Sequence, residues 1–233
     1  MKMVRESLFD MPPTRVIELA RTAPPIHLSQ AMRSPGSVPI IDCGECLERV
    51  DKPVVDVSAL HHSNIPGALP TSFVRGGVMR RLVLASSSLP DGLQLALVDG
   101  WRSREAQQYM FTATVESDEL GAGWVANPDD PSVVPPHTTG GAVDVTLAIA
   151  NRPLLLGTVP GDYSQLSWLM SFEGAHCDKL VRDLRRLLFA VMCGAGFVPY
   201  EQEWWHFSYG DQEWAAASSA SHAIYGMVNE VTL

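Results

Sequence analysis

Cysteine and long apolar runs are both scarce in this chain. Only 4 of its 233 residues are cysteines, which is too few for a disulfide scaffold at this length. No segment reaches the ~18 apolar residues that a membrane-spanning helix needs, and the longest candidate, 187–198, is interrupted by Gly194 and Gly196. The first ten residues carry charges where a signal peptide needs an apolar core. We therefore expect a soluble, cytoplasmic protein that has no membrane partner.

Positive charge is also in short supply. Lys and Arg number 17 against 26 Asp and Glu, which gives a formal net charge of −9. A general nucleic-acid binder needs a basic face, so we expect no nucleic-acid partner. The sequence has no Gly-x-Gly-x-x-Gly and no P-loop, which disfavours nucleotide chemistry. It also lacks the Gly-x-Ser-x-Gly elbow, which weakens a serine hydrolase interpretation.

The composition that is present is typical of a globular protein. Hydrophobic residues make up 46% and charged residues 18% of the chain. A length of 233 residues allows one or two domains at about 150 residues each, and no stretch looks like a linker between two. We therefore expect a single α+β domain, with a central, mainly antiparallel sheet flanked by helices.

Local patterns predict where the elements lie. The clearest helix is 177–193, where apolar residues recur with a period of 3.6 and Gly194 or Gly196 can end the helix. Ser103 can cap a helix that runs to about 120. We further expect helices over 14–21 and 73–85, strands over 39–47, 93–99, 142–149, 197–200 and 204–209, and loops over 58–72, 126–136 and 151–164.

The segment 136–147 joins a histidine to an aspartate. Gly140-Gly141 permits a sharp turn that could fold His137 back beside Asp144, which lies in the apolar strand that follows. A carboxylate in such a strand is costly to bury unless something neutralises it, and a bound metal ion would do so. The alternative is a turn followed by an aspartate that is hydrogen-bonded to the backbone.

A second segment, Glu203-Trp204-Trp205-His206-Phe207, places two tryptophans between a carboxylate and an imidazole. This water-poor setting can raise the pKa of a carboxylate toward that of a general base. In a regular strand Glu203 and His206 would point to opposite faces, so a shared site requires a bend, a bulge or a turn. The alternative is an aromatic core strand with Glu203 at its exposed start.

Together the two segments supply the groups needed for metal-assisted hydrolysis. His137, Asp144 and His206 can hold zinc by three protein ligands and leave a fourth position for water. Glu203 is a nearby carboxylate that can take a proton from that water. Arg102 lies where a predicted strand ends and a helix begins, and it could stabilise the oxyanion that forms on a carbonyl. The alternative for Arg102 is a surface arginine paired with a neighbouring carboxylate.

These elements, in this order, resemble the zinc D-alanyl-D-alanine dipeptidases of the VanX type, within a wider group of D,D-carboxypeptidases and hedgehog-like zinc domains. The family pattern is Ser-x-His-x-x-Gly-x-Ala-x-Asp followed later by Glu-x-x-His. It is matched here by His137, Gly140, Ala142 and Asp144, and then by Glu203 and His206. The segment Asp99-Gly100-Trp101-Arg102 looks like the family's Asp-Gly-Tyr-Arg, and weaker similarity extends over 39–209.

The resemblance implies a role for each of these residues. His137, Asp144 and His206 would bind Zn²⁺, Glu203 would be the general base, and Arg102 would polarise the scissile carbonyl. The implied activity is hydrolysis of a small D-amino-acid dipeptide, with D-Ala-D-Ala as the leading substrate. The implied fold is hedgehog-like, with residues 1–38 as an N-terminal extension packed on a catalytic domain of residues 39–233. The oligomeric state stays open.

Two stretches depart from the family pattern. Pro135 stands where the family has a serine, and 156–163 only partly matches a string whose aspartate helps to hold the substrate's amino group. Asp162 is the nearest candidate for that role. A zinc D,D- or L,D-carboxypeptidase, or an enzyme acting on another small amide or metabolite, is therefore an alternative. A non-catalytic zinc-binding domain is a further one, which the presence of both Glu203 and Arg102 disfavours.

Overall fold

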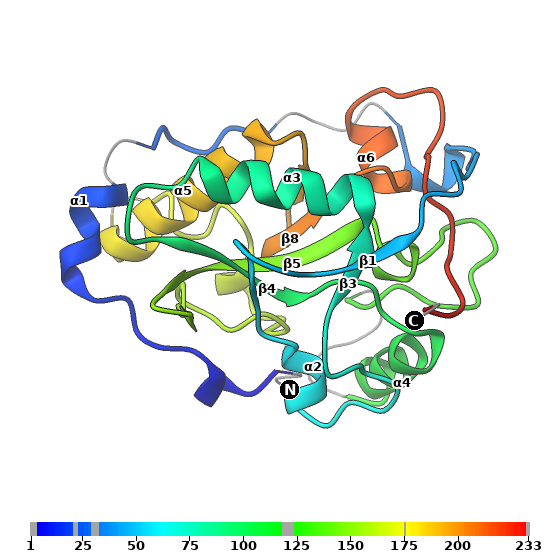
Figure 1. Cartoon of the computed structure of the whole chain (residues 1–233), viewed down its shortest axis with the longest axis horizontal. Helices are drawn as coiled ribbons and strands as arrows, with labels where there is room; N and C mark the ends of the chain where they lie inside the picture. The colour runs from blue at the N-terminus through cyan, green and yellow to red at the C-terminus, as the bar shows by residue number, and fades with distance from the viewer. Residues whose placement is uncertain (1–3, 21–22, 29–32, 118–123, 175, 232–233) are drawn as a thin grey trace.

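The computed structural model describes residues 4–20, 23–28, 33–117, 124–174 and 176–231. Its larger sheet runs between the helices (Figure 1). The strand order is β2-β4-β5-β8-β7, and β6 pairs with β5. The β2–β4 pair is parallel, whereas β4–β5, β5–β6, β5–β8 and β7–β8 are antiparallel. The strands are β2 (Val55–Asp56), β4 (Gln94–Asp99), β5 (Ala142–Ile149), β6 (Arg152–Pro153), β7 (Val198–Tyr200) and β8 (Glu203–Ser208).

A smaller sheet and a set of helices complete the described part. The smaller sheet pairs β1 (Leu47–Arg49) with β3 (Phe73–Arg75) in antiparallel fashion. The α-helices are α1 (Ile17–Ala20), α2 (Ala59–His62), α3 (Gly76–Ser87), α4 (Arg104–Val115), α5 (Lys179–Gly194) and α6 (Gln212–Ala217). Short 3₁₀ turns lie at Glu6–Leu8, Thr14–Val16, Pro35–Ser37, Pro136–Thr139 and Gln165–Ser167.

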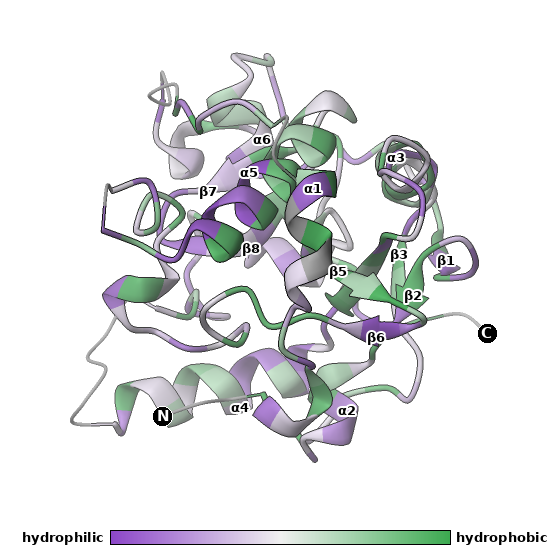
Figure 2. Ribbon diagram, turned by 90° about the vertical axis from the view of Figure 1, so that its left-hand side faces the viewer, coloured by the Kyte–Doolittle hydropathy of each residue, from purple (hydrophilic) through white to green (hydrophobic). Residues whose placement is uncertain are grey.

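The larger sheet separates two hydrophobic cores. Figures 1 and 2 place α3 and α5 on one side of it and α2 and α4 on the other. Val143, Val145 and Leu147 of β5 belong to the core beneath α3 and α5. Because side chains alternate along a strand, Asp144 projects toward the opposite side, where α2 and α4 enclose the second, smaller core. The alternation of β5 therefore decides on which face of the sheet Asp144 lies.

Several predicted elements are confirmed. Helices and sheets share one mixed α/β domain, and the helix predicted over 177–193 is α5, which Asp178 caps by accepting bonds from two backbone N–H groups. Ser103 caps α4 as expected, since its Oγ accepts from the backbone N–H of Ala106 at 3.1 Å. The helix α4 ends at Val115, short of the predicted 120, and residues 118–120 lie outside the described residues.

Other predictions are wrong at the boundaries. The helix predicted from residue 73 begins only at Gly76, because Phe73–Arg75 pairs with β1 as a strand. Apolar residues such as Phe73 and Val74 can be buried in a helix or in a strand, so their spacing alone does not distinguish the two structures. The predicted loop 58–72 contains α2, and the loop 151–164 contains β6. The strand predicted over 39–47 is limited to an isolated bridge between Ile40 and Ala223 and to Leu47, where β1 begins.

The N-terminal residues lie against both cores. Val16, Ala20 and Ile26 are buried in the larger core, and Val4 and Phe9 are buried in the smaller one. Asp10 bridges to Leu154 through backbone hydrogen bonds. The predicted division between an extension of residues 1–38 and a catalytic domain of residues 39–233 stays a prediction.

Candidate active site

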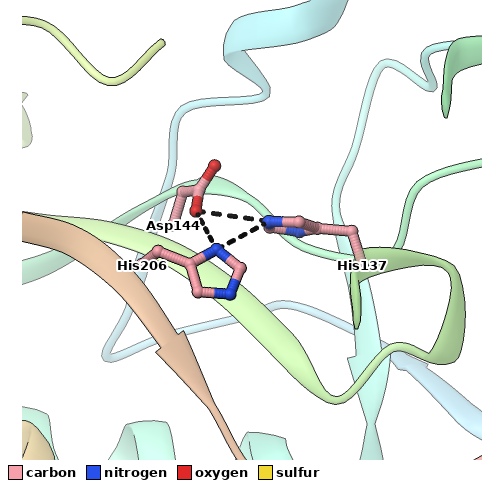
Figure 3. Close-up of side chains that lie close together, drawn as sticks. All are labelled: His137, Asp144 and His206. Atoms are coloured by element: carbon pink, nitrogen blue, oxygen red, sulfur yellow. Dashed lines mark hydrogen bonds and ion pairs between the residues drawn. The ribbon is translucent and has the colours of Figure 1, made fainter. Parts of the chain in front are cut away.

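Three of the predicted residues converge in one buried cluster (Figure 3). His137 comes from the 3₁₀ turn Pro136–Thr139, Asp144 from β5 and His206 from β8. Oδ1 of Asp144 lies 3.3 Å from Nε2 of His137 and 3.1 Å from Nδ1 of His206, and the two nitrogens are 3.2 Å apart. The residues are 5%, 8% and 6% exposed in chain order. Two imidazoles and one carboxylate thus offer three converging donor atoms.

The local backbone explains this convergence. Asp144 and His206 are direct partners in the β5–β8 register, so their side chains meet across adjacent strands. Gly140 ends the 3₁₀ turn with φ of 72°, a left-handed conformation that favours glycine. This turn reverses the chain and brings His137 beside the strand that carries Asp144. The sharp turn predicted from Gly140-Gly141 is therefore present.

The electrostatics of the cluster suit a bound cation. Burial alone would raise the pKa of Asp144, but the charges and hydrogen bonds of His137 and His206 outweigh it and lower that pKa. Burial alone would lower the pKa of His206, but hydrogen bonds and charges of Asp144 and Glu213 raise it well above its usual value. The donor set, two nitrogens and one oxygen, is one that metal ions accept in proteins. Among the described residues, His137, Asp144 and His206 form the group of histidine, cysteine or acidic side chains whose donor atoms lie close enough together to bind one metal ion.

Glu203 lies at the edge of this cluster. Its Oε2 is 3.8 Å from Nδ1 of His206. The β7–β8 register shifts here, because Pro199 pairs with Phe207 whereas Tyr200 pairs with Glu203. This irregularity lets Glu203 and His206 face one site, as the sequence required. Burial raises the pKa of Glu203 to about 8, reinforced by the negative charge of Asp144 and opposed by the positive charge of His206.

Arg102 is buried, so the surface position in the alternative interpretation is wrong, whereas the pairing with a neighbouring carboxylate, Asp99, is present. Its Nε and Nη2 donate to Oδ2 of Asp99 at 3.0 and 2.7 Å, and its Nη1 donates to Oε1 of Gln107 at 2.9 Å. Burial alone would lower the pKa of Arg102, but the charges of Asp99 and Asp144 raise it. Its backbone N–H also donates to the carbonyl of His137 at 3.1 Å, which ties the arginine to the histidine turn.

These five residues line one cavity of about 140 Å³. The described lining also includes Pro160, Gly161 and Tyr163, but not Asp162. The Asp162 carboxylate accepts from the backbone N–H of Ser164 at 3.0 Å. The cavity therefore gives no support to Asp162 as the group that holds the substrate's amine.

Several groups around this site were not predicted from the sequence motifs. The carbonyl oxygen of Gly100 accepts from Nδ1 of His137 at 2.9 Å, and Glu213 approaches His206 from α6. Val4 reaches the lining from the N-terminal segment. No motif spacing marks Glu213 or Val4, because long-range packing alone brings them to the site.

Comparison with known proteins assigns the region that contains this site to a family. A family model described as D-Ala-D-Ala dipeptidase, of the M15 peptidases, matches residues 78–224, which include Arg102, the cluster and Glu203. The chain belongs to the D-Ala-D-Ala dipeptidase family. It is therefore a metallopeptidase, as the sequence predicted. Among the described residues, no helix is both long enough and apolar enough to cross a membrane.

Two known proteins align with the chain. A D-alanyl-D-alanine dipeptidase of Synechocystis sp. is 28% identical over 241 residues, which cover 82% of this chain and 95% of that protein. A D-alanyl-D-alanine dipeptidase of Escherichia coli is 29% identical over 121 residues, which cover 50% of this chain and 55% of that protein. The first of these alignments spans nearly the whole relative.

Proposed function

We propose that this chain is a zinc-dependent dipeptidase that hydrolyses the peptide bond of a small D-amino-acid dipeptide, with D-Ala-D-Ala as the leading substrate. The observation that carries the proposal is the buried cluster of His137, Asp144 and His206 with Glu203 and Arg102 on the same cavity. The names of the two relatives support the substrate. A cavity of about 140 Å³ also favours a small ligand, since sites for drug-sized ligands are typically about 300–1,000 Å³.

The donor chemistry of the cluster fits zinc. Two imidazole nitrogens and one carboxylate oxygen are the ligand types of catalytic zinc sites, which keep a further position for water or substrate. His137, Asp144 and His206 would hold the ion. When bound, zinc supplies a Lewis acid and lowers the pKa of water at the site.

Glu203 moves the proton in the proposed reaction. Its carboxylate takes a proton from the attacking water, whose oxygen forms the new bond to the scissile carbonyl carbon. The same carboxyl group then gives the proton to the amine nitrogen as the C–N bond breaks. The raised pKa of Glu203 suits both steps, because a general base works best when its pKa is near the working pH.

Arg102 stabilises the charge that develops on the scissile carbonyl oxygen. Asp99 and Gln107 hold the guanidinium in one orientation before substrate binds. Donors that are fixed in advance need no reorganisation as the oxyanion forms, and this is the largest single contribution in many hydrolases. The attack on the carbonyl thus uses Glu203 and Arg102 in distinct roles, and Arg102 supplies a permanent positive charge.

The variant Glu203→Ala tests this assignment. It should retain zinc, because Glu203 is not among the proposed ligands, and lose turnover of D-Ala-D-Ala by about 10²-fold or more. Zinc content is measured on the purified chain and turnover by release of free amine. Glu201→Ala, which removes an exposed neighbouring carboxylate, is the matched control and should match the wild type. Loss of zinc from Glu203→Ala would contradict its role as base.

A substrate panel separates the dipeptidase from its alternative. D-Ala-D-Ala is compared with a pentapeptide that ends in D-Ala-D-Ala, again by release of free amine. We expect cleavage of the dipeptide only. Cleavage of the pentapeptide but not of D-Ala-D-Ala would overturn the dipeptidase assignment in favour of a carboxypeptidase.

A further inference from the structure

Glu213 is a carboxylate of the cavity that the proposed mechanism does not use. Asp99 is paired with Arg102, Asp144 belongs to the cluster and Glu203 is the proposed base. Glu213 lies on α6, its side chain is 25% exposed, and its Oε2 is 3.6 Å from Nε2 of His206. It therefore faces the ring nitrogen of His206 that points away from the cluster.

The geometry of His206 decides which nitrogen carries its proton. Nδ1 faces Oδ1 of Asp144 and Nε2 of His137, so Nδ1 is the atom that would bind the metal. A ligating nitrogen needs its lone pair, and a neutral imidazole has a single N–H, which must then sit on Nε2. His206 is buried, so this N–H needs an acceptor within the protein.

Two described acceptors lie near that N–H. Oγ of Ser208 is 3.5 Å and Oε2 of Glu213 is 3.6 Å from Nε2 of His206. The Ser208 hydroxyl in turn donates to Oε2 of Glu213 at 3.3 Å. The Nε2–H of His206 can therefore reach the carboxylate of Glu213 either directly or through the Ser208 hydroxyl.

The short helix that carries Glu213 is fixed at its start. The Asp211 carboxylate caps α6 by accepting from the backbone N–H of Trp214 at 2.9 Å. The Gln212 side chain donates to the backbone carbonyl of Val38 at 2.9 Å. Both neighbours of Glu213 in the chain, Gln212 and Trp214, are thus held by hydrogen bonds, which fixes the backbone that places Glu213 beside His206.

The two histidines of the cluster are supported differently. His137 faces the cluster through Nε2, and its Nδ1 donates to the backbone carbonyl of Gly100 at 2.9 Å, while the nearest carboxylate oxygen, Oδ2 of Asp99, lies 3.7 Å away and accepts from Arg102. His206 faces the cluster through Nδ1, and its Nε2 points to a carboxylate. A carboxylate on the outer nitrogen fixes the tautomer and the ring orientation and makes the inner nitrogen a stronger donor.

We propose that Glu213 is a positioning residue for His206, which accepts the Nε2–H directly or through Ser208 and thereby strengthens zinc binding at Nδ1. The inference rests on the proposed function, because it requires zinc at the cluster. Loss of such a partner weakens metal affinity by about 10–100-fold in comparable sites.

Zinc affinity of the full-length chain tests the proposal. Competition with a chromogenic chelator gives the Kd for Zn²⁺ alone, with no substrate present. Glu213→Ala should raise this Kd by about 10–100-fold. Glu213→Gln, which keeps a neutral acceptor, should fall between Glu213→Ala and the wild type. Glu201→Ala removes a nearby exposed carboxylate and should leave the Kd unchanged.

The thermal unfolding of the metal-free chains separates positioning from a structural role. We expect metal-free Glu213→Ala to unfold in one cooperative transition somewhat below that of the wild type, since it loses the charge of Glu213 beside His206, whereas loss of the cooperative transition would overturn the inference and assign Glu213 a structural role. A wild-type Kd in Glu213→Ala, with a raised KM for the dipeptide, would overturn the inference and assign Glu213 to substrate binding. If the wild type itself bound no zinc, the proposed function would fail, and this inference with it.

Discussion

Arg102 differs from a surface arginine because all three nitrogens of its guanidinium donate hydrogen bonds within the protein. Asp99 receives two of its hydrogen bonds and Gln107 a third, all in a buried setting. A planar guanidinium fits this arrangement, whereas the single ammonium of lysine does not. The position of Arg102 beside the cluster therefore depends on its shape as well as its charge.

Arg102→Lys should lower kcat on the dipeptide by about 10²–10³-fold, the loss seen when one oxyanion donor is removed. The variant keeps a positive charge, and its zinc content should equal that of the wild type. Steady-state kinetics and metal analysis check both expectations. The control is Arg104→Lys, two residues along, where the side chain is exposed and pairs with Asp129. An equal loss of kcat in the two variants would contradict the proposed role of Arg102 in stabilising the oxyanion.

At the scale of elements, α5 holds a long irregular segment in place. The Arg185 side chain is buried and donates to the carbonyl oxygens of Leu156, Leu166 and Trp168 at 2.9, 3.1 and 3.2 Å. Its guanidinium also lies 4.3 Å from the centre of the Phe172 ring. The segment between these carbonyls contributes Tyr163 to the cavity wall, so one residue of α5 supports a wall of the site.

Arg185→Leu should lower the free energy of unfolding by roughly 1–3 kcal/mol, because the buried carbonyl of Leu156 is left without a donor. Urea denaturation measures this loss. Arg182→Leu, on the same helix, replaces a more exposed arginine paired with Asp183, and it should cost less. If both variants lost the same stability, the anchoring by Arg185 would be refuted.

Elements with strong local signals could be predicted from the sequence. The apolar stripe of α5 and the Ser103 cap of α4 are present as expected. The segment Phe73–Arg75 could not be assigned, because its pairing with β1 is a long-range interaction that short apolar spacing does not encode. The register shift in β8 was required by the roles of Glu203 and His206, yet its form depends on pairing with β7.

At the scale of the whole molecule, the site draws on residues far apart in the chain. The motif residues around His137 and Glu203 could be found from spacing, because the turn and the strand that present them are local. Val4 and Glu213 reach the same cavity through tertiary packing, which no short motif records. The residues that line the site therefore include several that lie outside the sequence motifs.

Metal removal tests the site through the stability of the entire chain. At a zinc concentration about 1,000 times the Kd, binding to the native state alone adds roughly 4 kcal/mol. For a chain of 233 residues this is roughly 8–16 °C in Tm, at about 2–4 °C per kcal/mol. Calorimetric scans with zinc and with a chelator should differ by that amount in the wild type. His206→Ala should show no zinc-dependent difference, because one donor atom of the cluster is gone, and an equal shift in this variant would place the stabilising zinc elsewhere.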